Sequence, residues 1–238
     1  MKAFLLAAGL GTRLRPITDS ITKCLVPIAG RPLLAWWIDH LERHGVDEVL
    51  INTHHLPEGV ERWVAGYTGP VRIHLAFEPE LLGSAGTLHA QKWFVEGERD
   101  FYILYADNLT DVDLGELLRR HRERPAVLTM GLFHAENPSA CGIVTLDEEG
   151  RIVEFEEKPE HPKSDLASAG IFVASPELFQ YVDPASICPY DFGTHVIPHL
   201  EGLMNGLLVH GYLRDVGTHE NLLKAERDWS LRPDLPGL

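Results

Sequence analysis

The chain has few cysteines, and those it has are scattered. Its 238 residues include three, Cys24, Cys141 and Cys188. An odd number of dispersed cysteines makes neither a disulfide framework nor a Cys-x-x-Cys metal site. This pattern indicates a reducing compartment, and we expect the protein in the cytoplasm.

Positive charge is scarce as well. The chain carries 21 Lys and Arg against 35 Asp and Glu, a formal net charge of −14 at pH 7. A nucleic-acid binder needs clustered cations to neutralise many phosphates, so this balance predicts no nucleic-acid partner. A nucleotide substrate remains compatible with it, since one triphosphate needs only a few basic groups and a metal ion.

Long apolar runs are absent. No stretch reaches the ~18 apolar residues of a membrane span, so no membrane partner is expected. The N-terminal run Lys2–Ala8 is short and leads into Gly9 and Gly11. It therefore predicts a core strand and not a signal peptide.

What the first half does contain is an alternation of strand-like and helix-like segments. Apolar side chains recur at helical spacing between the strand candidates, for example at Leu34, Trp37, Ile38 and Leu41. Such alternation predicts the α/β class, with a Rossmann-like, mainly parallel mixed sheet flanked by helices. Ligands of such sheets bind at the carboxyl ends of the strands. The expected strands are Lys2–Ala7, Glu48–Thr53, Val71–Ala76, Phe101–Ala106 and Ala126–Leu132.

The second half has a different pattern. Gly142–Leu146 and Arg151–Phe155 flank a turn sequence and predict a hairpin, which we interpret as a small β insertion. Ser168–Ala174 predicts one more strand, followed by a short helix that Ser175 and Pro176 open. A last helix is expected from Thr218 to about Trp229.

Two glycines follow the first expected strand. Gly9 and Gly11 allow the backbone to come close to a ligand, and N–H groups of such a loop can cradle phosphate. The loop lacks the third glycine of a dinucleotide fingerprint and the Gly-Lys-Ser/Thr of a P-loop. By itself it fits a tight turn with an exposed arginine equally well.

The continuation to Pro27 favours the phosphate cradle. The pattern Gly-x-Gly-Thr-Arg-Leu-x-Pro-x-Thr-x4-Lys-x-Leu-x-Pro starts at Gly9. It resembles the signature of the sugar-1-phosphate nucleotidyltransferases, which join a nucleoside triphosphate to a sugar 1-phosphate and release pyrophosphate. The resemblance implies catalytic roles for Arg13 and Lys23, which would offset phosphate charge. It also implies a nucleotide site made of Ala7, Ala8, Gly9, Gly11, Thr12, Arg13, Lys23 and, further along the chain, Asp107.

The segment Glu78–Leu88 is the second element that resembles the family. From the residues alone it could be an ordinary helix entry with Ser84 as the cap. In the family it is a base-binding loop, and Leu-Gly-Ser-Ala-Gly is similar to the guanylyl and uridylyl branches. The resemblance implies base contacts from Glu78, Gly83, Ser84 and Gly86. A carboxylate at Glu78 is a natural acceptor for guanine N1–H and its exocyclic amine, which favours GTP.

Two aspartates are the candidate metal ligands. Asp107 follows an apolar strand, where a carboxylate can hold Mg²⁺, although an aspartate there is often only a turn former. The resemblance identifies Asp107 as the strand-end metal ligand and Asp215 as its partner, both catalytic, with Mg²⁺ as the cofactor. Leu213 stands where the family commonly has tryptophan, and Arg214 adjoins Asp215.

A glutamate–lysine pair marks the expected sugar-phosphate pocket. Glu157-Lys158-Pro159 is usually a solvated strand exit. In the family the lysine meets the sugar phosphate, which makes Lys158 a catalytic residue that orients the nucleophile. The pocket implied by the resemblance consists of Asn108, Gly142, Glu157, Lys158, Ala169, Gly170 and Asp191.

Together these motifs predict transfer of a nucleoside monophosphate, from GTP in preference, to mannose 1-phosphate or a similar sugar. Thymidylyl or uridylyl transfer to glucose 1-phosphate is one alternative. A metal-dependent glycosyltransferase using Asp111 and Asp113 is another, and so is a non-catalytic paralogue that binds nucleotide sugar. Asp113 is explained more simply as a helix cap.

The motifs also suggest how the chain is divided. We interpret residues 1–230 as one domain, with 1–135 mainly for the nucleotide and 136–215 mainly for the sugar phosphate, followed by a loose tail at 231–238. The expected partners are the two small-molecule substrates, and a homo-oligomer is left open.

Overall fold

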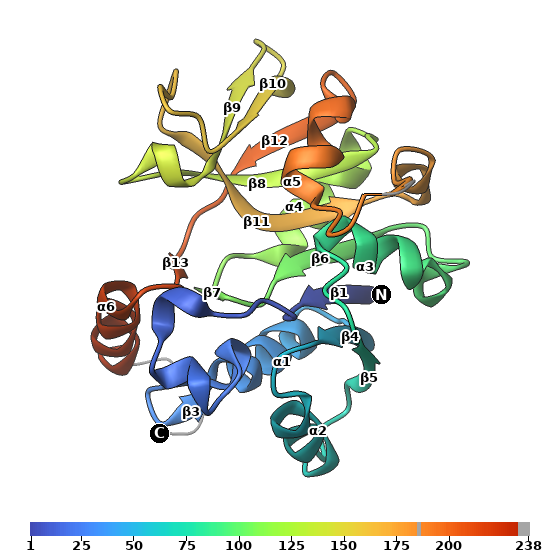
Figure 1. Cartoon of the computed structure of the whole chain (residues 1–238). Coiled ribbons are helices and arrows are strands. Elements are labelled where there is room, and N and C mark those ends of the chain that lie inside the picture. Colours follow the sequence, from blue (N-terminus) through green and yellow to red (C-terminus); the bar gives the residue numbers. More distant parts are fainter. Residues whose placement is uncertain (185–186, 233–238) are drawn as a thin grey trace.

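A nine-stranded sheet organises the molecule (Figure 1). The computed structural model describes residues 1–184 and 187–232. The strand order is β5-β4-β1-β6-β11-β8-β12-β10-β9. In chain order the strands are β1 Lys2–Leu6, β4 Glu48–Thr53, β5 Arg72–Phe77, β6 Phe101–Tyr105, β8 Leu128–His134, β9 Gly142–Leu146, β10 Arg151–Glu157, β11 Leu166–Ala174 and β12 Met204–Leu208.

The sheet is parallel in one half and mixed in the other. β5, β4, β1 and β6 pair in parallel, as βαβ connections require. β11 then pairs antiparallel with both β6 and β8, β12 is parallel to β8, and β10 and β9 continue antiparallel. The expected α/β class is confirmed, and the parallel pairing concentrates in the first half of the chain. The predicted hairpin is β9–β10, which extends the edge of the same sheet.

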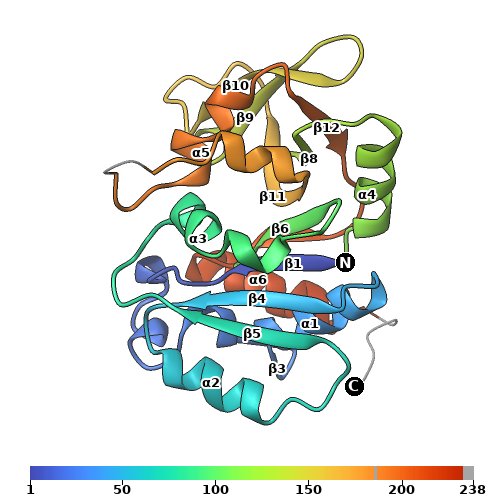
Figure 2. The same cartoon turned by 90° about the vertical axis from the view of Figure 1, so that its right-hand side faces the viewer.

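Helices cover both faces of the sheet. They are α1 Leu33–Arg43, α2 Pro57–Ala65, α3 Ser84–Ala90, α4 Leu114–Glu123, α5 Phe192–His195 and α6 His219–Ser230. Successive side chains of a strand point to opposite faces, so Ala3 and Leu5 pack in a core with α1, α4 and α6, whereas Phe4 packs in a second core with α3 and α5. Figure 2 shows β4 and β5 with α1 and α2 in the lower part of the molecule, and β8 to β12 above them.

Two short ribbons stand outside the main sheet. β7 (Asn108–Thr110) pairs antiparallel with β13 (Leu213–Asp215), and β2 (Pro27–Ile28) pairs with β3 (Arg31–Pro32). In the β7–β13 register Asp215 lies opposite Asn108. This pairing brings the C-terminal part of the chain back to the end of β6.

The expected helix and strand limits mostly hold. α6 begins where expected, with the Thr218 hydroxyl accepting from the Asn221 amide at 3.2 Å, and Asp113 caps α4. The strand β12 was not expected. The predicted tail falls largely on residues 233–238, which lie outside the described residues. Within the described ranges no helix is long and apolar enough to cross a membrane.

Candidate active site

The loop after β1 curls back on itself at Gly11. Gly11 has φ +62°, and a Cβ there would lie 2.8 Å from Thr18 Cγ2, so only glycine fits. The Thr18 hydroxyl donates to the Gly11 carbonyl at 2.8 Å and holds the curl closed. A 3₁₀ turn, Thr12–Leu14, follows; it buries Leu14 and leaves Arg13 exposed. The loop therefore presents Arg13 and the backbone around Gly9 to the outside, as a phosphate cradle requires.

Lys23 joins the two predicted metal ligands. Its Nζ lies 2.7 Å from Asp107 Oδ2 and 3.3 Å from Asp215 Oδ1, and its side chain is only 10% exposed. Arg13 Nη2 lies 3.8 Å from Asp215 Oδ2. The Gly217 amide donates to Asp215 Oδ1 at 2.6 Å and fixes that carboxylate. Arg13, Lys23, Asp107 and Asp215, from three separate parts of the sequence, thus form one charged cluster.

The donor set of this cluster fits a magnesium ion that arrives with phosphates. Mg²⁺ is usually bound by one or two carboxylates together with substrate phosphates, and not by an all-protein cage. Asp107 and Asp215 are 40% and 45% exposed, so both can receive an ion from the open side. In the described part of the chain no group of three or more His, Cys, Asp or Glu side chains is arranged to hold a metal. Asp107 and Asp215 are the two carboxylates that the cluster offers to such an ion.

Arg214 does not enter the site. Side chains alternate along β13, so Arg214 points away from the face that carries Asp215. Its Nε donates to the Tyr212 hydroxyl at 3.0 Å, and its Nη2 lies 3.5 Å from Asp228 Oδ2 on α6. Leu213 packs against the core formed with α1 and α6. The departure from the common tryptophan motif thus leaves Asp215 in place beside Lys23.

Glu78 is not placed to read a base, and this corrects the prediction. Its side chain is 2% exposed. Oε1 accepts from Asn52 Nδ2 at 2.9 Å and from the Thr87 hydroxyl at 2.5 Å, while Oε2 accepts from the Leu82 amide at 3.1 Å. The carboxylate is turned into the protein, where it organises the loop Leu82–Gly86. The argument for GTP from Glu78 is lost.

A hydrogen bond joins Ser84 to Asp191. Ser84 is the first residue of α3 and not its cap, which is Gly83. The Ser84 hydroxyl donates to Asp191 Oδ2 at 2.9 Å and accepts from the Phe192 amide at 2.7 Å. The other oxygen of Asp191 accepts from the Thr194 amide and caps α5. Each oxygen of Asp191 thus accepts one hydrogen bond within the protein, and the half-buried carboxylate ties the start of α3 to α5.

Lys158 and Gly142, two of the predicted sugar-phosphate residues, lie beside Glu157. Lys158 Nζ lies 3.0 Å from Glu157 Oε1. This hydrogen bond raises the pKa of the Lys158 ammonium above its usual value, against the opposing effect of burial. A Cβ on Gly142 would lie 2.9 Å from Glu157 Oε2, and a Cβ on Gly193 2.7 Å from it, so the carboxylate sits between two glycines. Lys158 also has an αL backbone, with φ 47°.

Asn108 and Gly170 form the floor of this side. Asn108 is 9% exposed, and its Nδ2 donates to the Ala169 carbonyl at 3.0 Å. Gly170 has φ +67°, and a Cβ there would lie 2.9 Å from both Asn108 Nδ2 and Tyr105 Cδ2. Asn108 therefore ties β7 to β11, and Gly170 leaves room for that contact.

Sequence reasoning missed Tyr105 and Asn52. Tyr105 ends β6 and is hydrogen-bonded to Ser84; burial, followed by the nearby charge of Asp191, raises the pKa of its phenol well above its usual value. Asn52 ends its apolar run on β4, buried at 3% exposure. A polar residue at the carboxyl end of a central strand was the available signal for both.

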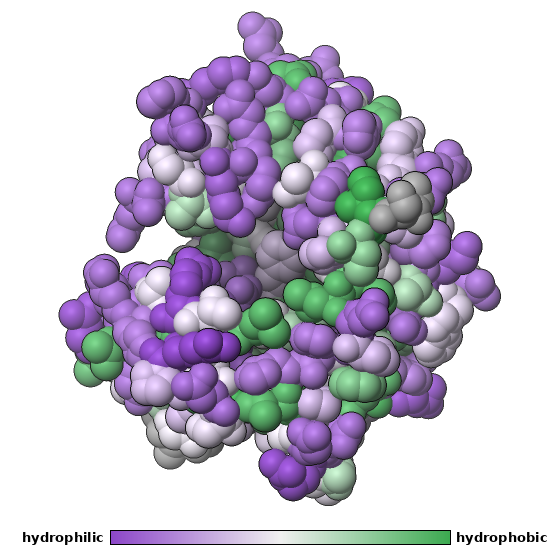
Figure 3. All heavy atoms as spheres, in the orientation of Figure 1, coloured by the Kyte–Doolittle hydropathy of each residue, from purple (hydrophilic) through white to green (hydrophobic). Residues whose placement is uncertain are grey.

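The molecular surface is hollowed on the face that carries β7 and β13 (Figure 1 and Figure 3). The face drawn in Figure 1 is hollowed between the upper part with β9 and β10 and the lower part with the N-terminal segment (Figure 3). β7 and β13 lie beside this hollow.

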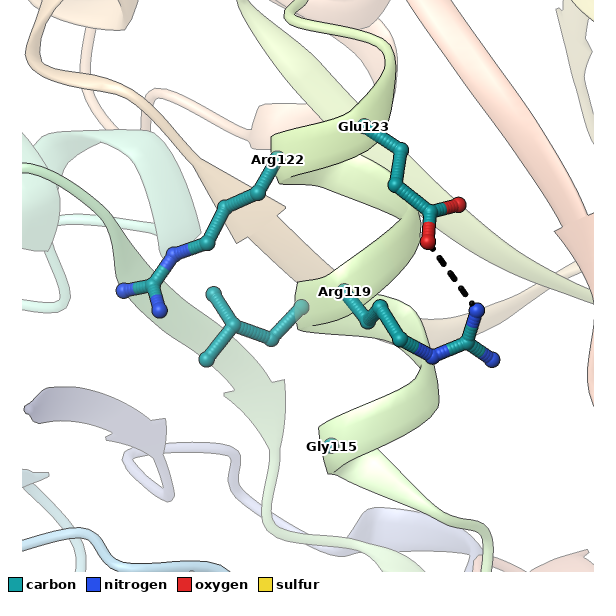
Figure 4. Close-up of a pocket in the computed structure, with 5 residues that line it drawn as sticks. Gly115, Arg119, Arg122 and Glu123 are labelled. Atoms are coloured by element: carbon teal, nitrogen blue, oxygen red, sulfur yellow. Dashed lines mark hydrogen bonds and ion pairs between the residues drawn. The ribbon is translucent and has the colours of Figure 1, made fainter.

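A separate pocket on α4 is not part of the site. Its volume is about 330 Å³, and it is lined by Gly115, Leu118, Arg119, Arg122 and Glu123 (Figure 4). Arg119 pairs with Glu123 at 3.2 Å and Arg122 with Asp100 at 2.7 Å, so both guanidinium groups already have carboxylate partners.

The Asp-x-Asp tripeptide of the glycosyltransferase alternative is used structurally. Asp113 accepts from the Glu116 amide at 3.1 Å as the cap of α4. Asp111 Oδ1 accepts from the Tyr212 amide at 2.5 Å, and its Oδ2 contacts Arg232. The two carboxylates thus have separate partners on separate elements, which disfavours that alternative.

Comparisons with known proteins agree with the motifs. A family model described as Nucleotidyl transferase matches residues 2–230. The chain is 35% identical over 215 residues to a UTP–glucose-1-phosphate uridylyltransferase of Synechocystis sp., covering 84% of this chain and 55% of that protein. It is 33% identical over 238 residues to a glucose-1-phosphate thymidylyltransferase of Streptomyces antibioticus, covering 95% and 65%. It is 30% identical over 229 residues to mannose-1-phosphate guanyltransferase beta-B of Xenopus laevis, covering 94% and 63%.

The chain spans between about half and two thirds of the length of these curated relatives. Two solved structures share its fold. A Bacillus anthracis protein described as a candidate glucose-1-phosphate thymidylyltransferase superposes with a TM-score of 0.85 at 24% identity, covering 98% of this chain and 96% of that one. HddC from Yersinia pseudotuberculosis superposes with a TM-score of 0.80 at 20% identity, covering 96% and 99%.

Proposed function

Because this chain belongs to the nucleotidyl transferase family, we propose that it transfers a nucleoside monophosphate from a nucleoside triphosphate to a sugar 1-phosphate and releases pyrophosphate. The observation that carries the proposal is the cluster of Lys23, Asp107, Asp215 and Arg13 beside the glycine loop. Phosphoryl-type transfer is catalysed mainly by positioning and charge neutralisation, and this cluster offers both.

Each charged side chain has a task in an in-line displacement. Arg13 and Lys23 stabilise negative charge on the triphosphate and on the departing pyrophosphate. Lys158, held by Glu157, orients the incoming sugar phosphate. That phosphate is already a competent nucleophile, so the protein needs no general base to activate it. Asp107 and Asp215 would hold Mg²⁺, which supplies further charge neutralisation at the phosphates when bound.

The substrate pair is a finer proposal. We take GTP and mannose 1-phosphate as the first pair, because Leu82-Gly83-Ser84-Ala85-Gly86 is similar to the guanylyl and uridylyl branches and several of the relatives are mannose-1-phosphate guanylyltransferases. UTP or dTTP with glucose 1-phosphate is the alternative, supported by the uridylyl and thymidylyl relatives. The backbone of that loop, and not Glu78, would make the base contacts.

The remaining assignments follow from the same reaction. We propose that residues 1–135 mainly serve the nucleotide and 136–215 the sugar phosphate, within one domain of residues 1–230. We place the protein in the cytoplasm, since Cys24, Cys141 and Cys188 are free thiols.

A matrix of GTP, UTP, dTTP and ATP against mannose and glucose 1-phosphate, with Mg²⁺, tests the proposal by pyrophosphate release. Turnover with one pair, abolished in Asp107→Asn and strongly lowered in Arg13→Ala, is the expected result. Full turnover by Asp107→Asn would show that the catalytic roles assigned to the charged cluster are wrong. Turnover with dTTP or UTP and none with GTP would replace the substrate pair and keep the reaction. Sugar transfer from a nucleotide sugar without pyrophosphate would support the glycosyltransferase alternative, and binding without turnover the non-catalytic one.

A further inference from the structure

Asn52 ends the pairing between β1 and β4 with its side chain. In the register of the two strands Asn52 lies opposite Leu6, the last residue of β1. The next amide, that of Ala7, donates to Asn52 Oδ1 at 2.7 Å. A side chain thus takes the place of a strand partner at the point where the chain leaves the sheet for the glycine loop.

The amide group of Asn52 also reaches the base loop. Nδ2 donates to Glu78 Oε1 and to the Thr87 hydroxyl, each at 2.9 Å. An asparagine amide has two donor hydrogens and one acceptor oxygen, and all are used here. Glu78 then accepts from the Leu82 amide at 3.1 Å. A continuous chain of hydrogen bonds therefore runs from Ala7 through Asn52 and Glu78 to Leu82.

The side chains that make these hydrogen bonds are buried, so their positions relative to one another are tightly constrained. Asn52 is 3% exposed, Glu78 2% and Thr87 0%. A buried carboxylate must receive hydrogen bonds or cost free energy, whereas apolar side chains of the same volume would fill the space without that requirement. The Ala7 amide donates to Asn52 and the Leu82 amide donates to Glu78, so these directional hydrogen bonds fix the distance between the two loops. Apolar packing would fix that distance less strictly.

We propose that Asn52 and Glu78 are positioning residues for the nucleotide: they set the spacing between the glycine loop that holds the triphosphate and the loop that holds the base. The inference rests on the proposed function for what binds in those loops. Neither side chain touches the ligand, and neither contacts the Glu157–Lys158 side. Loss of the connection is therefore expected to weaken binding of the triphosphate and to leave binding of the sugar phosphate unchanged.

Asn52→Ala is the direct test. Removing partners of a buried carboxylate and a buried amide is expected to weaken triphosphate binding by about tenfold. Binding is measured by calorimetry with the preferred triphosphate and no sugar phosphate, and the KM for each substrate by pyrophosphate release. The KM for the triphosphate rises, and the KM for the sugar 1-phosphate stays within about twofold.

A donor–acceptor exchange separates positioning from simple loss of packing. Asn52→Asp alone sets two carboxylates against each other, and Glu78→Gln alone sets an amide against the Leu82 N–H or the Asn52 amide. In the double variant Asn52→Asp/Glu78→Gln, the glutamine Nε2 donates to the aspartate, while the glutamine Oε1 accepts from Leu82 and the aspartate accepts from Ala7. Each single variant weakens triphosphate binding, and the double variant recovers it to within about threefold of the wild type.

Asn205→Ala is the matched control. Asn205 is a buried asparagine on β12, 5% exposed, with Nδ2 donating to the Arg124 carbonyl at 2.6 Å. Its loss lowers the melting temperature and leaves both KM values unchanged. If Asn52→Ala does not fold, Thr87→Val, which removes the hydroxyl but keeps the shape, takes its place and shows a smaller loss of triphosphate binding.

Three results would overturn the inference: unchanged triphosphate affinity in folded Asn52→Ala or Thr87→Val, an equal rise of both KM values, or a folded double variant with no recovery. Wild-type protein that binds a triphosphate but turns over no substrate pair would instead reject the proposed function. In that case calorimetry alone decides the role of Asn52 and Glu78.

Discussion

The ammonium of Lys23 lies 2.7 Å from a carboxylate oxygen of Asp107, 84 residues away in the sequence, and its side chain is 10% exposed. The amine also lies 3.3 Å from Asp215 and so compensates both carboxylates. A magnesium ion at these carboxylates would take over part of that compensation.

Removal of this amine is expected to make the fold depend more strongly on metal. In Lys23→Met two carboxylates face each other without a resident cation, so EDTA lowers the melting temperature more than in the wild type, and Mg²⁺ restores more of it. Pyrophosphate release is strongly reduced at all Mg²⁺ concentrations. Lys224→Met, which removes an exposed pair with Glu220 at 2.8 Å, serves as the control and keeps the wild-type response to metal. An identical EDTA effect in Lys23→Met and wild type would contradict this.

Gly217→Ala should impair catalysis with little effect on folding. A Cβ at this position would lie 2.7 Å from Asp215 Oδ1, 2.9 Å from Arg13 Nη2 and 2.9 Å from Lys23 Nζ. These are the mobile ends of side chains, so the fold adjusts at small cost while the charged groups move. Misplacement of about 1 Å can lower kcat/KM by roughly a hundredfold. Gly66→Ala, whose Cβ would meet the Trp63 carbonyl at 3.6 Å, is the control with wild-type kinetics.

Ser84→Ala should affect the sugar substrate although Ser84 lies on the base loop. The hydroxyl holds Asp191 at 2.9 Å and Phe192 at 2.7 Å, which form the wall of the sugar side. Losing about 1 kcal/mol of hydrogen bonding predicts a KM for sugar 1-phosphate about fivefold higher, with Ser84→Thr close to wild type. Ser230→Ala, which removes an exposed hydroxyl, is the control. A higher KM for the triphosphate alone would refute the coupling.

His40 is expected to make the protein less stable in acid. Burial, followed by the charges of His44 and Arg43, lowers its pKa from 6.5 to about 3. The folded state therefore keeps His40 neutral while the unfolded state takes up a proton below pH 6.5. Its contribution to stability is complete above pH 6.5 and is lost as the pH falls from there toward 3, by about 2 kcal/mol between pH 7.5 and 5.

Urea unfolding of wild type and His40→Gln at pH 7.5 and 5 measures this contribution. The glutamine amide can replace the contact of His40 Nε2 with the Val112 carbonyl, now 2.9 Å. The variant is expected to lose less stability between the two pH values than the wild type. Equal losses would show that other histidines dominate, among them His121, whose pKa burial also lowers.

The sequence predicts an element of this fold correctly where a local residue pattern defines it. The prediction fails where contacts with residues far away in the sequence define the element. The strand Glu48–Thr53 matches its prediction, because the adjacent apolar residues Val49, Leu50 and Ile51 carry the signal. The strand β12 was not predicted, because Met204–Leu208 is short and is interrupted by Gly206. It forms a strand through its pairing between β8 and β10.

The same contrast applies to the site. Asp107 and Asp215 could be paired in advance because each belongs to a motif of the family. Glu78 could not be placed correctly, since its partner Asn52 lies 26 residues earlier and nothing local shows that the two face each other. The hydrogen bond from Ser84 to Asp191 could not be expected either, because the two residues lie 107 positions apart.

The pairing of β7 with β13 brings together the two ends of a long segment of the chain. Everything from Asp111 to Tyr212 leaves the region of Asp107 and returns to that of Asp215 through three paired residues on each side. The intervening length contains β8 to β12 and the Glu157–Lys158 pair. Within this segment β11 is anchored in the main sheet beside β6, so its two ends and its middle are all fixed to the first half of the chain. We therefore expect substitutions close to Glu157 and Lys158 to change the sugar side while Asp107 and Asp215 keep their places.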